Sequence, residues 1–274
     1  MEPGYQRKLV QFVEFVLREQ PDLLALQEVS QSASAAEIDP SMLQGLSPVK
    51  NQCVPVRSDN HAAWVAFLLR EAGVNASWTW LPIKIGYDRY DEGLAIMSLN
   101  RKIAEIDSIQ LSRSTDYSNW RTRKALGVRV DGCQDWFYTV HMGWWSDPEE
   151  PFQFQWDNLK NGVSHRQSNT WLMGDFNSPA EVRGEGYDQI RADGWQDAWL
   201  LAEDTRGNAT VEGAIDGWRE RVENPDELTG MRIDHIWCSR PQTVPRARVV
   251  FDGRNEPKVS DHFGILMETK GATA

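Results

Sequence analysis

Four short stretches of the chain place acidic, amide and imidazole side chains where apolar runs end. They read LQEV, LMGDFNSPA, RIDHI and VSDHFGI, and each contains or borders an apolar run typical of a β-strand. Strand ends that open into loops are where protein scaffolds usually place functional groups. The candidate residues are Glu28, Asp175, Asn177, Asp234, His235, Asp261 and His262.

Each stretch taken alone also has a purely structural explanation. Glu28 could be a solvated acid at the end of a strand, and Asp175 with Asn177 could form an Asx turn. Asp234 is harder to explain in this way, because an acid inside an apolar strand needs a partner. Taken together, the stretches indicate a site with several carboxylates, an amide and histidines.

Oxygen ligands of this kind suit Mg²⁺ or Mn²⁺ better than Zn²⁺. An ion held by one or two carboxylates keeps positions for water and for a substrate phosphate. The remaining acids and the histidines could then activate a water molecule and stabilise developing charge. The residues therefore predict metal-assisted hydrolysis of a phosphate ester.

The elements that must position these residues follow from the hydrophobic pattern. Leu9, Phe12 and Val16 at helical spacing predict a helix over residues 5–19, which Pro21 ends. Further helices are predicted at 61–73, 152–164 and 186–192, polar loops at 31–60 and 203–229, and a frayed tail at 269–274. Strands are predicted at 22–29, 77–83, 93–98, 103–111, 124–130, 136–141, 170–176, 231–239, 247–252 and 263–268.

Few helices separate these runs of strands, which predicts an α/β (α+β) fold of two packed mixed β-sheets with helices outside. With no repeat and no clean linker, we expect a single domain over residues 1–274. No apolar run approaches the roughly 20 residues that cross a membrane, and no secretory leader is visible, so a cytoplasmic protein is expected. The three cysteines, Cys53, Cys133 and Cys238, are then reduced thiols.

The four stretches, in this order and with this spacing, resemble the endonuclease/exonuclease/phosphatase family over residues 5–268. That resemblance implies a DNase I-like four-layer sandwich and a Mg²⁺-dependent phosphoesterase, with Mn²⁺ as a possible substitute. It also implies roles for individual residues, which are predicted here as follows: Glu28 binds the metal, Asp261 lies near it, Asp175 orients water, Asn177 holds the phosphate, and His262 is catalytic and paired with Asp234.

Two further motifs belong to the same resemblance. His141 in VHMGWW resembles the second family histidine, and Glu92 in DEGLAI resembles the acid that pairs with it. His235 matches no family role and is predicted to be structural. The family usually begins with a strand of the form T-x-N, and no such strand precedes Glu28. Two explanations are open: Met1 is an internal methionine of a longer natural protein, or the chain is complete as given. In the second case we expect the sheet to lack one central strand and the metal site to be weakened.

The stretches YDEGLAIMS, NWRTRKALGV and VHMGWW resemble the branch that includes maltose 6'-phosphate phosphatase. Arg121 and Arg123 could then bind the phosphate, and the rings of Trp144 and Trp145 could stack on a sugar. Against this, one arginine could be a solvated surface residue and either tryptophan could pack in the core. The net charge of −11 makes a nucleic-acid substrate less favourable. A DNA nuclease and a non-catalytic relative of the same fold remain the alternatives.

Overall fold

The computed structural model describes residues 4–213 and 229–270. Its helices are α1 (Tyr5–Glu19), the 3₁₀ helix η1 (Pro40–Leu43), α2 (His61–Glu71), α3 (Phe152–Val163), α4 (Gly186–Ala192) and α5 (Ala198–Leu201). Its strands are β1 (Leu23–Ser32), β2 (Ser77–Gly86), β3 (Tyr90–Ser98), β4 (Ile103–Gln110), β5 (Lys124–Val130), β6 (Trp136–His141), β7 (Thr170–Asp175), β8 (Gln196–Asp197), β9 (Ala202–Arg206), β10 (Val211–Glu212), β11 (Gly230–Met231), β12 (Asp234–Cys238), β13 (Val244–Val250) and β14 (Gly264–Glu268).

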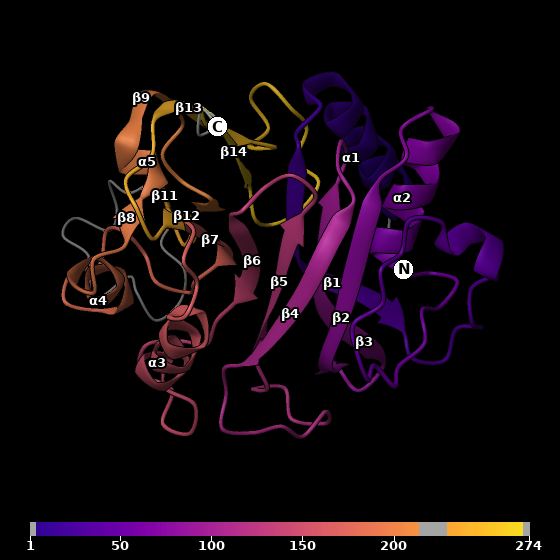
Figure 1. Cartoon of the computed structure of the whole chain (residues 1–274), viewed down its shortest axis with the longest axis horizontal. Helices are drawn as coiled ribbons and strands as arrows, with labels where there is room; N and C mark the ends of the chain where they lie inside the picture. Colours follow the sequence, from indigo (N-terminus) through magenta and orange to yellow (C-terminus); the bar gives the residue numbers. More distant parts are fainter. Residues whose placement is uncertain (1–3, 214–228, 271–274) are drawn as a thin grey trace.

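Two layers of strands lie between two layers of helices, as the sequence predicts. Figure 1 shows α1 and α2 on one flank of the molecule and α3 and α4 on the other. The central layers are the antiparallel sheet β1-β3-β2 and the mixed six-stranded sheet β4-β5-β6-β7-β12-β8. In the second sheet β6 runs parallel to β7, and β7 runs antiparallel to β12. This arrangement brings the ends of β6 and β7 beside the start of β12.

Alternation along the strands divides the core between the layers. Leu94 and Ile96 of β3 pack with Leu126 and Val128 of β5 between the two sheets. The intervening β3 residues, such as Met97, pack on the other face against α1 and α2. Because successive strand residues point to opposite faces, one strand serves two cores. The sandwich therefore holds β1 firmly against β6 and β7, where the candidate residues lie.

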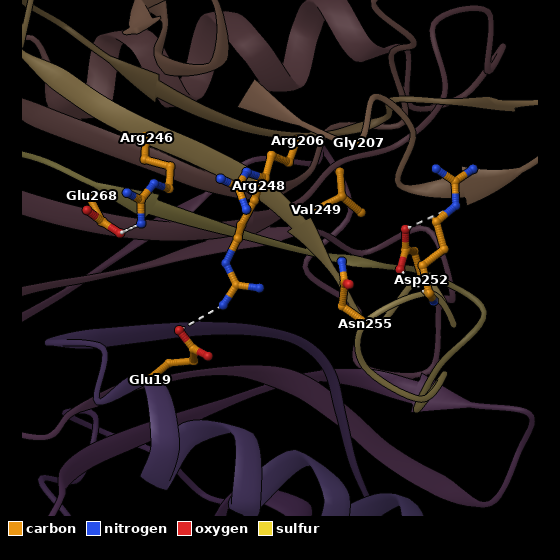
Figure 2. Close-up of a pocket in the computed structure, with 10 residues that line it drawn as sticks. Glu19, Arg206, Gly207, Arg246, Arg248, Val249, Asp252, Asn255 and Glu268 are labelled. Atoms are coloured by element: carbon orange, nitrogen blue, oxygen red, sulfur yellow. Dashed lines mark hydrogen bonds and ion pairs between the residues drawn. The ribbon is translucent and has the colours of Figure 1, made fainter. Parts of the chain in front are cut away.

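The sheet next to α1 differs from the prediction in being divided. Strands β14, β13 and β9 form a separate three-stranded sheet, and β14 and β1 each pair with one strand only in the part of the chain that the structure describes. A cavity of about 460 Å³ opens between the end of α1 and this smaller sheet. Figure 2 shows Arg248 reaching across it to Glu19, at a nitrogen–oxygen distance of 2.7 Å. The arginines that line the cavity are paired with acids, so it contains no free cationic site among the described residues.

The boundaries of the predicted elements agree closely with the structure where the pattern is strong. The helix over 5–19 and the strands over 124–130 and 136–141 begin and end at the predicted residues. The prediction of loop from residue 203 is wrong at its start, because Ala202–Arg206 forms β9, parallel to β13. Its side chains are mostly exposed, so no hydrophobic alternation marked the strand. The rest of that prediction, over 214–228, and residues 271–274 of the tail lie outside the described residues.

Candidate active site

Strand register brings three of the predicted residues into one row. Asp175 ends β7, and its Cα partners are His141 on β6 and Asp234 on β12. The His141 Nε2 lies 3.6 Å from a carboxylate oxygen of Asp175. Asp175 and Asp234 are thus two carboxylates directly opposite each other in a sheet. They repel one another, so placing them together costs free energy unless a positively charged group lies nearby.

The surroundings of Asp175 make its ionised form unfavourable. Its side chain is buried, and Oδ1 accepts a hydrogen bond from the backbone N–H of Asn177 at 2.7 Å. Burial, followed by the charge of Asp234, raises the pKa of Asp175 to about 8. A buried acid whose pKa lies near neutral pH is suited to accept a proton from water.

Asn177 is held in place by the loop that follows β7. Its φ is 45°, in the left-handed region that asparagine tolerates better than most residues. Its side-chain amide donates to the Met142 carbonyl at 2.8 Å. Gly174 is the next-to-last residue of β7. Its φ is 133°, and a Cβ there would lie 2.2 Å from the Val140 carbonyl oxygen. The GDFN stretch therefore needs its glycine to bring β7 this close to β6.

His262 pairs with Asp234, as predicted. The ring Nδ1 lies 3.1 Å from Asp234 Oδ2. Burial alone would lower the pKa of His262, but the hydrogen bond to Asp234 and the charge of that carboxylate outweigh it and raise the pKa to about 9. His262 is therefore an imidazolium at neutral pH, and its Nδ1–H donates to Asp234. Its Nε2–H has no hydrogen-bond partner among the residues that the structure describes, so it could donate to an anion.

The predicted pairing of His141 with Glu92 is wrong. Glu92 forms an ion pair with Lys84 of β2, at 3.0 Å, and the acids beside His141 are Glu28 and Asp175. Burial, followed by the positive charge of Arg123, holds the pKa of His141 well below its usual value, so the ring is neutral. The register of β2 against β3 opposes Lys84 to Glu92, and that choice cannot be seen in the spacing of the motifs.

Glu28 lies at an irregularity in β1. The register of β1 against β3 shifts between Leu26 and Val29, and Glu28 has a φ of 52°. This bulge turns the carboxylate out of the sheet, with 65% of the side chain exposed and Oε1 3.8 Å from His141 Nδ1. Bulges commonly redirect a side chain at a functional site.

Two buried cations complete the site, and sequence reasoning found only one of them. Arg123 was predicted as a phosphate ligand, whereas Lys84 was not identified. The carbonyl oxygen of Trp120 accepts hydrogen bonds from both, at 3.1 Å from Lys84 Nζ and 2.7 Å from Arg123 Nη1. The buried Nε of Arg123 has no hydrogen-bond partner among the described residues. A lysine inside the apolar strand SWTWLPIKIG was the available signal, because a buried ammonium group needs a partner.

Other predicted contacts have different roles in the structure. Arg121 donates to Asp147 at 3.0 Å and forms an ion pair with Glu149 at 3.3 Å, so its guanidinium already has anionic partners. Trp145 packs on Phe152 in the core between the second sheet and α3, whereas Trp144 is half exposed. The prediction of Arg121 and Trp145 as substrate contacts is therefore not supported by their positions. Sequence neighbours on an irregular loop point in different directions, which explains the difference between the two tryptophans.

His235, which was predicted to be structural, makes hydrogen bonds to the protein through both of its ring nitrogens. It is buried beneath the site, where its ring Nε2 donates to the Ser178 carbonyl at 2.8 Å. Its Nδ1 accepts from Arg232 at 2.7 Å, and Arg232 is in turn held by the buried Asp197 at 2.8 Å. This network supports the loop after β7 from below.

The carboxylates and imidazoles also form a group that could hold a metal ion. One ligand atom from each of Asp175, Asp234 and His262 lies within 4.8 Å of the others. The predicted ligand Asp261 is exposed at the edge of this group, with Oδ1 accepting from Ser260 at 3.0 Å. Oxygen donors predominate, and the raised pKa of Asp175 shows that carboxylate charge is incompletely balanced, so the residues fit a hard divalent cation.

In the described part of the chain, no helix is both long and apolar enough to span a lipid bilayer. The model of the endonuclease/exonuclease/phosphatase family matches residues 3–262. A comparison with curated proteins found no match.

Solved structures with the same fold cover nearly the whole chain. An endonuclease/exonuclease/phosphatase family protein from Leptotrichia buccalis C-1013-b has a TM-score of 0.81 at 22% identity, covering 98% of this chain and 95% of its own. A mannosyl-6-phosphatase from Bacteroides thetaiotaomicron has a TM-score of 0.62 at 18% identity, covering 97% and 92%. The human nocturnin catalytic domain with bound sulfate has a TM-score of 0.57 at 19% identity, covering 97% and 87%.

Proposed function

Because this chain belongs to the endonuclease/exonuclease/phosphatase family, we propose that it hydrolyses the phosphate monoester of a sugar with the help of Mg²⁺. The observation that carries this proposal is Arg123, a buried cation whose Nε has no hydrogen-bond partner among the described residues, beside a group of carboxylates and His262. Lys84, which also pairs with Glu92, adds a second positive charge next to it. The charges of Glu92, Asp175 and Glu28 all act on Arg123. A phosphate dianion would supply the acceptor that the Arg123 Nε lacks.

The residues divide the work of hydrolysis between them. Asp175 accepts the proton of the attacking water, for which its pKa of about 8 is suited. His262, as an imidazolium held by Asp234, stabilises charge on the phosphoryl or leaving oxygen. His141, which is neutral and buried, contacts Asp175 and orients the water or the phosphate. Asn177 lies between Asp175 and Met142 and can turn its amide toward a phosphate oxygen.

A divalent cation would be held by the carboxylates of Glu28, Asp175 and Asp261, while His262, as an imidazolium paired with Asp234, would not be a ligand. When bound, Mg²⁺ or Mn²⁺ supplies Lewis-acid polarisation of the phosphoryl oxygen. Glu28 is the natural first ligand because its exposed carboxylate projects from the β1 bulge toward the site.

A small phosphorylated sugar suits the surroundings better than a nucleic acid does. The net charge of −11 disfavours a long polyanion, which binds mainly through phosphate neutralisation. Trp144 exposes half of its surface beside the loop that carries Arg123. The name of the Bacteroides relative, a mannosyl-6-phosphatase, gives a precedent for this substrate class in the same fold.

The test is phosphate release from a panel of sugar phosphates, nucleotides and glycerol phosphate, with Mg²⁺ or with a chelator. We expect Mg²⁺-dependent release from sugar phosphates that His262→Ala abolishes and that His165→Ala, at an exposed histidine, leaves intact. Nicking of a plasmid without release from sugar phosphates would instead identify a nuclease. Mg²⁺ binding without hydrolysis of any ester would identify a non-catalytic relative.

A further inference from the structure

Two exposed tryptophans form a pair on the surface next to the site. Trp120 and Trp144 expose 45% and 50% of their surface, although most large apolar side chains of the chain are buried. They belong to different loops, before β5 and after β6, yet their ring centroids lie 5.9 Å apart at an interplanar angle of 57°. Leaving two large rings exposed to water costs free energy, so such an exposed pair commonly marks a binding surface.

The two loops are fastened to each other around this pair. The Arg121 guanidinium lies 4.4 Å from the centre of the Trp120 ring. The same group donates to Asp147 and pairs with Glu149, which both follow Trp144 in its loop. Arg121 thus stacks on the Trp120 ring of its own loop and forms ion pairs with carboxylates of the loop that carries Trp144. The Trp120–Trp144 pair is therefore preorganised before any ligand binds.

The main chain of Trp120 connects the pair to the catalytic centre. Its carbonyl oxygen is the shared acceptor of Lys84 and Arg123, the two cations proposed to bind phosphate. These hydrogen bonds hold the backbone of Trp120 against the two cations. A ligand with a phosphate at one end and a ring at the other can contact both at once.

We infer that Trp120 and Trp144 determine substrate specificity by binding the apolar face of a carbohydrate ring whose phosphate lies on Lys84 and Arg123. This inference rests on the proposed phosphatase activity. It names the residues that determine which alcohol, esterified to the phosphate, is accepted as the leaving group. A flat base sandwiched between two rings needs contacts of about 3.5 Å on both sides, so the ring planes must be parallel and about 7 Å apart. The centroids of the two rings are 5.9 Å apart and their planes are tilted by 57°, so they leave no such slot, and two exposed rings set at an angle suit a puckered sugar.

The test compares full-length variants on esters that differ in the leaving group. Trp120→Ala and Trp144→Ala remove the rings but keep the Trp120 carbonyl that holds the cations. For hexose and disaccharide phosphates we expect KM to rise about 5- to 10-fold with kcat changed less than about 2-fold. For glycerol phosphate, which has no ring, KM should change less than about 2-fold, and Trp120→Phe should recover part of the loss.

Trp64→Ala is the matched control, because Trp64 is a half-buried tryptophan on α2, in the opposite helical layer. An equal rise in KM for glycerol phosphate and sugar phosphates, or a rise for nucleotides alone, would overturn the inference.

Titration with sugar phosphates, followed by tryptophan fluorescence or calorimetry, measures ring binding without hydrolysis. If the wild-type protein hydrolyses no ester, the proposed function fails. The same titrations then decide the inference, which stands if both variants weaken binding and falls if neither does.

Discussion

The buried imidazole of His235 should make the stability of the protein fall steeply as the pH drops below 6.5. His235 is 1% exposed, and its two ring nitrogens have opposite roles, one donating to Ser178 and one accepting from Arg232. Protonation would give Nδ1 a hydrogen that faces a guanidinium. Burial, followed by the charge of Arg232, accordingly lowers the pKa of His235 to about 4.

The size of the effect follows from proton linkage. The unfolded chain takes up this proton near pH 6.5, whereas the folded protein resists it until about pH 4. The stabilisation is therefore complete above pH 6.5 and is lost as the pH falls through this window. Between pH 7 and pH 5 the loss is about 2 kcal/mol, because one pKa unit corresponds to about 1.4 kcal/mol.

Urea unfolding of wild type and His235→Asn, in chelator and from pH 7.5 to 4.5, measures this loss. Other groups titrate in both proteins, so the relevant quantity is the difference between their free energies of unfolding. That difference should shrink by about 2 kcal/mol from pH 7 to pH 5. His165→Asn controls for loss of an exposed imidazole, and His235→Gln replaces the asparagine variant if that protein does not fold. A difference that stays constant across this range would refute the assignment of His235 as a neutral, buried histidine.

Three further changes test the site and its support. Asp234→Asn should lower kcat by about 100-fold or more and shift the pH–rate profile to lower pH, because His262 loses the carboxylate that keeps it protonated; an unshifted profile contradicts this pairing. Asp197→Ala should cost about 3–5 kcal/mol in urea unfolding, because it strands the buried Arg232 guanidinium, and a loss below about 1 kcal/mol would exclude that role. Mg²⁺ should raise the thermal midpoint of wild type but not of Glu28→Gln, and an equal rise in both would remove Glu28 from the metal site.

Sequence patterns predicted the layers well because those layers depend on local regularity. The periodic apolar residues and Pro21 define α1 at both ends, and the alternation in β5 and β6 sets their bounds. The pairing of His262 with Asp234 was also predicted, because family motifs carry residue roles across gaps in sequence. β9 was missed, since its exposed side chains have no apolar alternation.

Contacts that depend on register between distant strands could not be predicted in the same way. The partner of Glu92 is Lys84 rather than His141, because β2 and β3 pair around a bulge that no local pattern reveals. The direction of each ring in the VHMGWW stretch depends on the loop that follows β6. Trp144 therefore faces solvent, while its neighbour Trp145 is partly buried and packs against the core.

The division of the sheet beside α1 gives the molecule two open edges. In the described chain, β1 hydrogen-bonds to β3 alone and β14 to β13 alone, and apolar residues such as Leu24, Leu26 and Leu266 on them are only partly buried. Backbone N–H and C=O groups along an open edge can pair with any extended chain that reaches them. Amide hydrogens there should exchange with solvent faster than those of β3 or β6, which have strands on both sides. In concentrated solution, an extended segment of a second copy of the protein would find unpaired backbone groups along both of these edges, as it would along other edge strands such as β2 and β4.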